Sequence, residues 1–342
     1  MISIDNLEKE LKAGKLNNIY LLYGEELFLL ENSLKKIKNI FGECIKGINY
    51  INIDETNYTE LIQDIETPAF GYEKKLIVAR NTGLLKKDGK RKNVELEKSR
   101  EKLIDYINQN IDIIKESIVL VFVEENADTK KKLYKVIDKN GIVCNFEYQK
   151  PIQLEKRIKA ICNGYEVEID NVVLRYFIEC CGTNMQDLIN EIRKLIEYAG
   201  KGGKITKEDI DELSIKKLES VIFDLTDSLG KKETAKALQV LKNLIYAKEP
   251  LQKILITLYN HFKKIYFSKL ALKYGKDIIS SLDLKPNQTF LVNKYKMQAG
   301  YFTENELKQI LQKLRDLDYE YKNGLIDLQI GMESVLCAYC SK

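Results

Sequence analysis

The sequence predicts an α/β domain built on a parallel sheet, followed by all-α domains. Three observations support this fold class. Short apolar segments alternate with helical patterns over the first 150 residues. After Pro151 we find helical patterns and no strand-like segment. The length of 342 residues corresponds to two or three domains, at about 100–200 residues for each domain.

The predicted strands of the first domain are short and almost entirely apolar. Residues 19–23 and 118–123 carry no charged side chain, and residues 48–53 alternate apolar residues with asparagine. The predicted strands are 19–23, 48–53, 76–79, 118–123 and 142–146. Near-continuous apolar strands are typical of a parallel sheet that helices cover on both faces.

The segments between these strands have helical periodicity. After the first strand, apolar residues recur at steps of three and four, as at Leu27, Leu30 and Leu34, which indicates an amphipathic helix. The predicted helices are 25–41, 59–66, 94–110 and 129–139. The basic run at 86–92 interrupts the pattern. We expect a solvated loop there, because such charge cannot enter an apolar core.

The chain beyond Pro151 is predicted to be helical. Three patterns come first, at 153–162, 171–181 and 184–199, and Thr206 then has the sequence context of a helix N-cap. Further apolar-faced helices with short connections follow, as expected of packed antiparallel helices: 218–229, 233–246, 251–274, 290–298, 304–321 and 328–339.

These patterns predict three domains. The α/β domain covers 1–150, a small helical domain covers 151–212, and a larger helical domain covers 213–342. The longest purely apolar run is 118–123, whereas a membrane-spanning helix needs about 20 residues. The N-terminus also lacks a basic start and an apolar stretch, so we expect no signal peptide and a cytoplasmic protein.

The available residue types exclude several kinds of chemistry. His261 is the single histidine, so a catalytic triad or a multi-histidine metal site has only this residue to draw on, and we expect it to be structural. The seven cysteines are expected to be reduced thiols. Cys337 and Cys340 form a lone CxxC pair, whereas a structural zinc site needs about four ligands. We therefore expect no metal and no cofactor.

The loop after the first strand lacks the chemistry of a phosphate-binding loop. Such a loop needs Gly-x4-Gly-Lys-Ser/Thr, but here Gly24 is followed by Glu25 and Glu26. Two acids suit the start of a helix and would repel phosphate. Glu124 and Glu125, after the fourth strand, resemble the magnesium-holding acids of an ATPase. Without a phosphate-binding loop, we expect them to be ordinary acids at a strand end.

One segment is strongly basic, although the net charge of the whole chain is only +4. Residues 253–296 contain nine lysines and two aspartates, a net charge of +7 over 44 residues, interleaved with aromatic side chains. This surface could follow a phosphate backbone, be a solvated face, or contact an acidic neighbouring subunit. The candidate contact residues are Lys263, Lys264, Lys269, Lys273, Lys294 and Lys296.

The segment 66–71, Glu-Thr-Pro-Ala-Phe-Gly, places an aromatic side chain in a turn. We expect a helix to end before Pro68 and a strand to begin after Gly71. Phe70 could fill the core of its own domain or project as an anchor for another protein. The residues alone leave both alternatives open.

Five segments, taken in order along the chain, resemble those of a known family: 20–29, 67–78, 181–195, 221–230 and 282–286. Each is a weak match, but their common order is fairly specific. Together they resemble the bacterial DNA polymerase III delta subunit, a part of the clamp loader. The first resembles the family's opening strand and degenerate nucleotide loop, the second its clamp-contact turn, the third its lid, and the last two its C-terminal domain.

The resemblance implies an AAA+-type domain without a working P-loop, a helical lid and a helical collar that joins a five-subunit loader. It implies no intrinsic activity, only membership of a DNA-directed DNA polymerase (nucleotidyltransferase) holoenzyme. The implied partners are the sliding clamp (beta ring), subunits of the gamma/tau and delta prime type, and primer-template DNA through the complex. No membrane partner is expected.

The family's apolar plug corresponds to Phe70 in this sequence. The implied clamp-binding residues are Ile65, Thr67, Pro68, Ala69 and Phe70. The family often has two bulky apolar residues here, and Ala69 departs from that pattern. The grip would then be weaker, or Ile65 or Tyr72 would supply the missing contact.

Two other functions stay open at this point. The first is an AAA+-type ATPase with an unusual nucleotide site, which ATP binding by the isolated chain would favour. The second is an independent nucleic-acid-binding module that uses residues 253–296. Steeply salt-dependent DNA binding without other subunits would favour that module.

Overall fold

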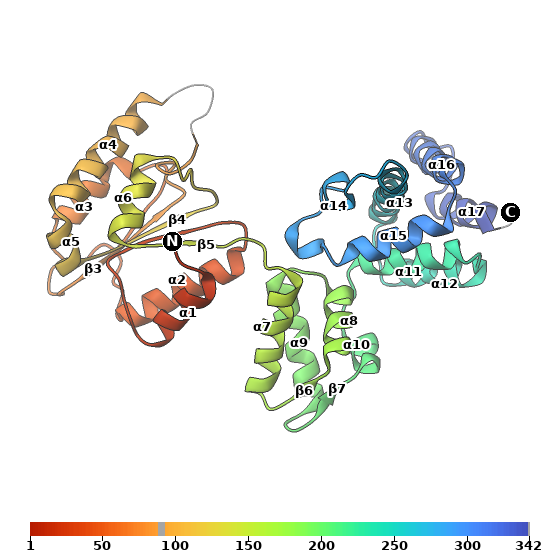
Figure 1. The fold of residues 1–342 in the computed structure, drawn as a ribbon, viewed down its shortest axis with the longest axis horizontal. Coiled ribbons are helices and arrows are strands. Elements are labelled where there is room, and N and C mark those ends of the chain that lie inside the picture. Colours follow the sequence, from red (N-terminus) through yellow and green to blue (C-terminus); the bar gives the residue numbers. More distant parts are fainter. Residues whose placement is uncertain (88–92, 341–342) are drawn as a thin grey trace. The chain divides into compact units, whose positions relative to one another are not determined.

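The computed structural model describes residues 1–87 and 93–340. The chain divides into two compact units, Met1–Tyr148 and Gln149–Lys342 (Figure 1). Most of the basic run at 86–92, which we predicted to be a solvated loop, lies outside the described residues.

Within the described part of the first unit, five parallel strands form one sheet in the order β2-β3-β4-β1-β5. In register, Ile19 of β1 lies opposite Leu120 of β4, and Leu76 of β3 lies opposite Val119 of β4. The strands are β1 (Ile19–Tyr23), β2 (Tyr50–Ile53), β3 (Lys75–Arg80), β4 (Ile118–Glu124) and β5 (Ile142–Asn145). The predicted parallel sheet is therefore confirmed.

Helices cover both faces of this sheet (Figure 1). One face carries α1 (Ile4–Lys12) and α2 (Leu27–Phe41). The other face carries η1 (Tyr58–Glu60), α3 (Leu61–Glu66), α4 (Val94–Gln109), α5 (Ile111–Ser117) and α6 (Lys132–Asn140). Helices α3 to α6 share one apolar core with alternate strand residues such as Leu21 and Phe122.

The second unit begins with four helices and a small ribbon of two parallel strands. These elements are α7 (Pro151–Gly164), β6 (Glu168–Ile169), α8 (Asn171–Cys181), α9 (Met185–Ala199), β7 (Lys204–Ile205) and α10 (Lys207–Leu213). The expectation that strands stop at Pro151 was wrong. Each of these strands has two residues, too few for a pattern of period two to be visible in the sequence.

The rest of the second unit is helical and has its own apolar core, which extends from Leu218 to Leu336. Its elements are α11 (Leu218–Gly230), α12 (Thr234–Tyr246), α13 (Leu251–Lys273), α14 (Ile278–Ser281), η2 (Pro286–Gln288), α15 (Leu291–Tyr301), α16 (Glu304–Lys322) and α17 (Leu328–Cys340). Both helical groups belong to one compact unit, so the boundary at 212/213 stays a prediction. No helix in the described residues is both long and apolar enough to cross a membrane.

Candidate protein-interaction site

The loop between β1 and α2 is closed by hydrogen bonds within the first unit. The amide of Gly24 donates to the carbonyl of Glu124 (3.2 Å), and the amide of Glu26 donates to the carbonyl of Phe146 (2.8 Å). A Cβ atom on Gly24 would lie 2.4 Å from the Phe146 carbonyl oxygen, so the close approach requires glycine. A phosphate-binding loop turns its amides toward the ligand, whereas two amides here are bonded to the protein itself.

Glu124 is the last residue of β4, and its buried side chain is hydrogen-bonded. Its Oε1 accepts hydrogen bonds from the backbone amide (3.0 Å) and the hydroxyl (2.9 Å) of Thr82. Burial raises the pKa of the Glu124 carboxyl to about 7, although the bonds from Thr82 act against this shift. Glu124 thus fixes the loop that follows β3. No group of three or more His, Cys, Asp or Glu side chains in the described residues could hold a metal ion.

Phe70 is the most exposed large apolar side chain among the described residues of the first unit, at 89%. The structure therefore excludes a core position for this residue. The amide of Tyr72 donates to the carbonyl of Ala69 (3.1 Å), and Gly71 has a φ of +78°. A positive φ at the third position is typical of a type II turn, which needs glycine there. Phe70 stands at the second position, at the corner of this turn.

Helix α3 leads into this turn and is fixed to the sheet. Leu61 and Ile65 lie one helical turn apart, and both are buried in the core of the first unit. Ile65 is 3% exposed, so its predicted role as a clamp contact is corrected: it anchors the helix. Thr67 and Pro68 are exposed and Ala69 is half-buried. The surface of the turn therefore comes from 67–71, which we call the interaction turn.

Both ends of the interaction turn are bonded to the rest of the unit. The buried ammonium of Lys75 donates to the carbonyls of Asp64 (2.8 Å) and Thr67. At the other end, the Tyr72 hydroxyl donates to Glu43 (3.2 Å). Burial lowers the pKa of Lys75, and the nearby Asp64 carboxylate partly offsets the shift. The turn is held on either side of an exposed aromatic side chain.

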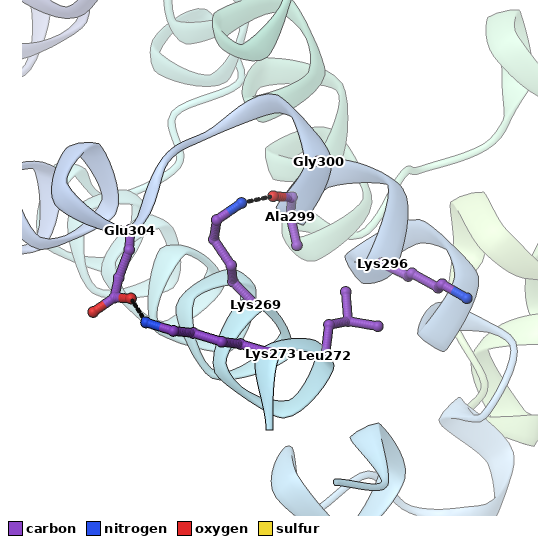
Figure 2. A pocket seen from close by; sticks show the side chains of 7 residues that line it. All are labelled: Lys269, Leu272, Lys273, Lys296, Ala299, Gly300 and Glu304. Atoms are coloured by element: carbon purple, nitrogen blue, oxygen red, sulfur yellow. Dashed lines mark hydrogen bonds and ion pairs between the residues drawn. The ribbon is translucent and has the colours of Figure 1, made fainter. Parts of the chain in front are cut away.

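The six lysines of the predicted basic surface differ in their contacts. Lys269, Lys273 and Lys296 line a pocket of about 450 Å³ between α13 and α15 (Figure 2). In it, the Lys269 ammonium donates to the carbonyl of Ala299 (2.9 Å), and Lys273 forms an ion pair with Glu304 (2.9 Å). Lys296 points away from both of these lysines (Figure 2).

The other three predicted lysines lie elsewhere on α13 and α15. Lys294 forms an ion pair with Glu179 of α8 (2.6 Å), which links the two helical groups of the second unit. The ammonium groups of Lys263 and Lys264 lie over aromatic rings. Three of the six candidates, Lys269, Lys273 and Lys294, therefore have acceptors within the chain.

His261 lies in a buried polar network inside the second unit. The amide nitrogen of Gln298 donates to the carbonyl of Phe223 (3.1 Å) and to Asp227 (2.6 Å). The oxygen of that amide must then accept from Nε2–H of His261 (2.7 Å), which fixes the neutral tautomer. Burial lowers the pKa of His261 to about 3. As expected from the sequence, this histidine is structural.

Sequence reasoning missed Lys75 and Thr82. The available signal for Lys75 was a lysine at the start of an apolar strand, directly after another lysine. Thr82 gave no signal, because its partner Glu124 is 42 residues away along the chain.

The fold and the site define a class of protein. It is a chain with a parallel-sheet domain followed by helices, and its exposed interaction turn is separate from the loop between β1 and α2. Residues 20–147 match the family described as "DNA polymerase III, delta subunit", and residues 219–339 match "DNA polymerase III delta subunit, C-terminal domain". The chain belongs to the DNA polymerase III delta subunit family.

Curated relatives and a solved structure agree with this assignment. DNA polymerase III subunit delta of Bacillus subtilis is 27% identical, covering 96% of this chain and 94% of that protein. The probable DNA polymerase III subunit delta of Aquifex aeolicus is 28% identical, covering 88% and 85%. The solved Bacillus subtilis DNA clamp loader delta protein has a TM-score of 0.74 at 25% identity, covering 99% of this chain and 100% of that one.

Proposed function

We propose that this chain is the subunit of a bacterial clamp loader that grips and opens the sliding clamp. The observation that carries the proposal is Phe70, 89% exposed on a turn that is bonded at both ends. An exposed aromatic side chain on a fixed backbone is the usual form of an interface anchor. Family membership and the clamp-loader name of the similar solved structure support the choice of partner.

The proposed mechanism uses binding energy and no bond chemistry. Burying a phenylalanine side chain in a partner contributes about 1.5–3 kcal/mol. A ligand shifts a conformational equilibrium only by its difference in affinity for the two states. The subunit must therefore bind the open clamp more tightly than the closed clamp, and the interaction turn supplies part of that difference.

We infer that the chain has no ATPase activity of its own. The loop amides at Gly24 and Glu26 are bonded to protein carbonyls, and Glu124 holds Thr82. These contacts, with the missing lysine and hydroxyl, count against the alternative of an unusual ATPase. The chain would serve a DNA-directed DNA polymerase holoenzyme as a non-catalytic subunit.

We propose that residues 151–212 act as a lid and residues 213–342 as a collar that assembles with other loader subunits of the gamma/tau and delta prime type. Primer-template DNA would be met through the whole complex, in the cytoplasm where replication takes place. The internal partners of Lys269, Lys273 and Lys294 count against an independent DNA-binding module.

A single set of titrations tests the proposal. The isolated full-length chain is mixed with its cognate sliding clamp, with and without magnesium-ATP, and binding is measured by calorimetry. We expect a complex of unchanged affinity in both conditions and no heat from ATP alone. Absence of a complex would overturn the clamp-binding role, whereas micromolar ATP binding would overturn only the non-catalytic part.

A further inference from the structure

Lys75 is an unusual residue at its position. The first five residues of β3 are buried, and Lys75 is the charged one among apolar neighbours, with 3% exposure. The preceding residue, Lys74, is exposed. Because an ammonium group is costly to bury without partners, its burial at the start of an apolar strand points to a local structural role.

The contacts of Lys75 identify that role. Its Nζ donates to the carbonyl oxygens of Asp64 and Thr67, at the C-terminal end of α3. The last carbonyls of a helix have no partner within the helix, and they form the negative end of its dipole. The Lys75 ammonium therefore joins the start of β3 to the end of α3, directly before the residues that carry Phe70.

We propose that Lys75 is a positioning residue that holds the interaction turn in its binding conformation before the partner arrives. The inference rests on the proposed function, because clamp binding is what this conformation serves. Phe70 is exposed, so packing within its own unit does not orient it. Its direction depends on two anchors of the turn: Lys75 holds the carbonyl of Thr67 before Phe70, and Tyr72 holds the chain after it. A turn that is already ordered loses less entropy when it binds.

The chain contains no tryptophan, so Phe70→Trp gives a protein with one indole reporter at the tip of the turn. We would combine this change with Lys75→Met, which keeps an unbranched side chain and removes the donors. Lys74→Met is the matched control, because it removes the same charge one residue away on the surface. Time-resolved anisotropy of the indole, measured without clamp, reports the mobility of the turn directly.

We expect Lys75→Met to increase the fast-decaying part of the anisotropy and Lys74→Met to leave it unchanged. With the clamp added, we expect Lys75→Met to weaken binding about tenfold, because a turn released from both hydrogen bonds must be ordered when it binds. In a Phe70→Ala background, Lys75→Met should weaken clamp binding by less than about threefold. The two effects are not additive, because Lys75 acts by positioning Phe70.

Unchanged anisotropy in Lys75→Met, or an equal loss of affinity with and without Phe70, would overturn the positioning role. If the indole signal does not respond to the clamp at all, the proposed function fails instead, and the anisotropy still decides the role of Lys75. Lys75→Gln, which keeps an amide donor, is the second variant. If neither variant folds, Lys75 serves the stability of the whole unit and the inference is wrong.

Discussion

Phe70 is suited to be an interface anchor because the turn that carries it is fixed by hydrogen bonds. The side chain is exposed. Before it, the carbonyl of Thr67 accepts a hydrogen bond from Lys75 of β3, and after it the hydroxyl of Tyr72 donates to Glu43. A side chain of this kind contributes little to the stability of its own unit. Nearly all of the free energy gained by burying it in a partner can contribute to binding, since the turn that carries it is already ordered.

We expect Phe70→Ala to weaken clamp binding roughly 30-fold, because an interface anchor costs about 2 kcal/mol or more when truncated. The melting temperature should stay nearly unchanged, since the side chain is 89% exposed. Calorimetric titration and thermal unfolding on the same sample measure both quantities. Ile113→Ala, which truncates another exposed apolar residue of the first unit, should alter neither quantity.

The sequence predicted the turn around Phe70 but could not decide its exposure. Pro68 and Gly71 mark a turn by local chemistry, whereas burial depends on how the end of α3 lies against the sheet. The same limit applies to Ile65. It has the spacing of a core residue, four positions after Leu61, and the resemblance to the family placed it at the contact surface instead. The helical period was the better guide in this case.

His261 shows how a buried polar residue can be held neutral. Its neighbours are aromatic rings of Phe223, Phe262 and Tyr295, and its polar partner is the amide of Gln298. Asp227 bonds to that amide, and the nearby Lys264 lowers the pKa of His261 further. Protonation would leave a buried positive charge without a carboxylate in contact.

The stability of the chain should therefore fall in mild acid. His261 has a pKa of about 3 when folded and about 6.5 when unfolded, so the unfolded state takes up the proton first. The resulting stability is present above pH 6.5 and is lost as the pH falls toward 3. Between pH 6.5 and 5 the loss should be about 1.5 kcal/mol. Urea unfolding at these two pH values, compared with His261→Gln, measures it, and an identical pH dependence in the variant would contradict it.

At the scale of elements, the loop from β1 to α2 depends on one glycine. Gly24 has a φ of +131°, and its α-carbon lies against the backbone of Phe146. Strand β1 is thereby joined to the segment after β5 by backbone hydrogen bonds as well as by strand pairing. The closed loop is a property of the backbone and does not depend on the acids at 25 and 26.

Gly24→Ala should destabilise the chain by about 2–5 kcal/mol, through a strained φ and a backbone clash. Gly42→Ala is the matched control. Gly42 also has a positive φ, but the described residues place no heavy atom within 4 Å of its added Cβ. That variant should cost only about 1–2 kcal/mol. Denaturant unfolding measures both, and equal losses would show that the close contact with Phe146 does not matter.

Elements were predictable where they were long and strongly patterned. The residues of β1 and the apolar steps of α2 gave clear signals, and the structure agrees with them. Helix α1 was missed although Ser3 caps it and Leu7 and Leu11 are buried one turn apart, because the helix is short and precedes the first strand. Strands β6 and β7 depend on pairing across 36 residues, which no local pattern reveals.

At the scale of the whole molecule, we expect the two compact units to have separate functions. The first contains the interaction turn and its own apolar core. The second contains the helical groups proposed as lid and collar. At many interfaces a few anchor residues contribute most of the binding energy. We therefore expect the first unit to contribute most of the affinity for the clamp.

We expect a fragment of residues 1–148 to bind the clamp within about fivefold of the full chain, because the interaction turn and its anchors all lie in this unit. A fivefold difference in affinity corresponds to about 0.95 kcal/mol. A fragment of residues 149–342 should not bind it but should enter the loader with the other subunits. Size-exclusion chromatography with each partner checks both. Clamp binding by 149–342, or loader entry by 1–148, would show that the functions are distributed differently.

The closed loop at Gly24 also limits how a nucleotide site could be engineered into this chain. If only side chains distinguished this loop from a phosphate-binding one, a few substitutions to lysine and threonine would be enough to create such a site. Here the amides of Gly24 and Glu26 already donate to Glu124 and Phe146, so a new lysine would enter a loop with those two donors already taken. Engineering a nucleotide site would therefore require moving the backbone between two strands, and substitution of side chains alone would not be sufficient.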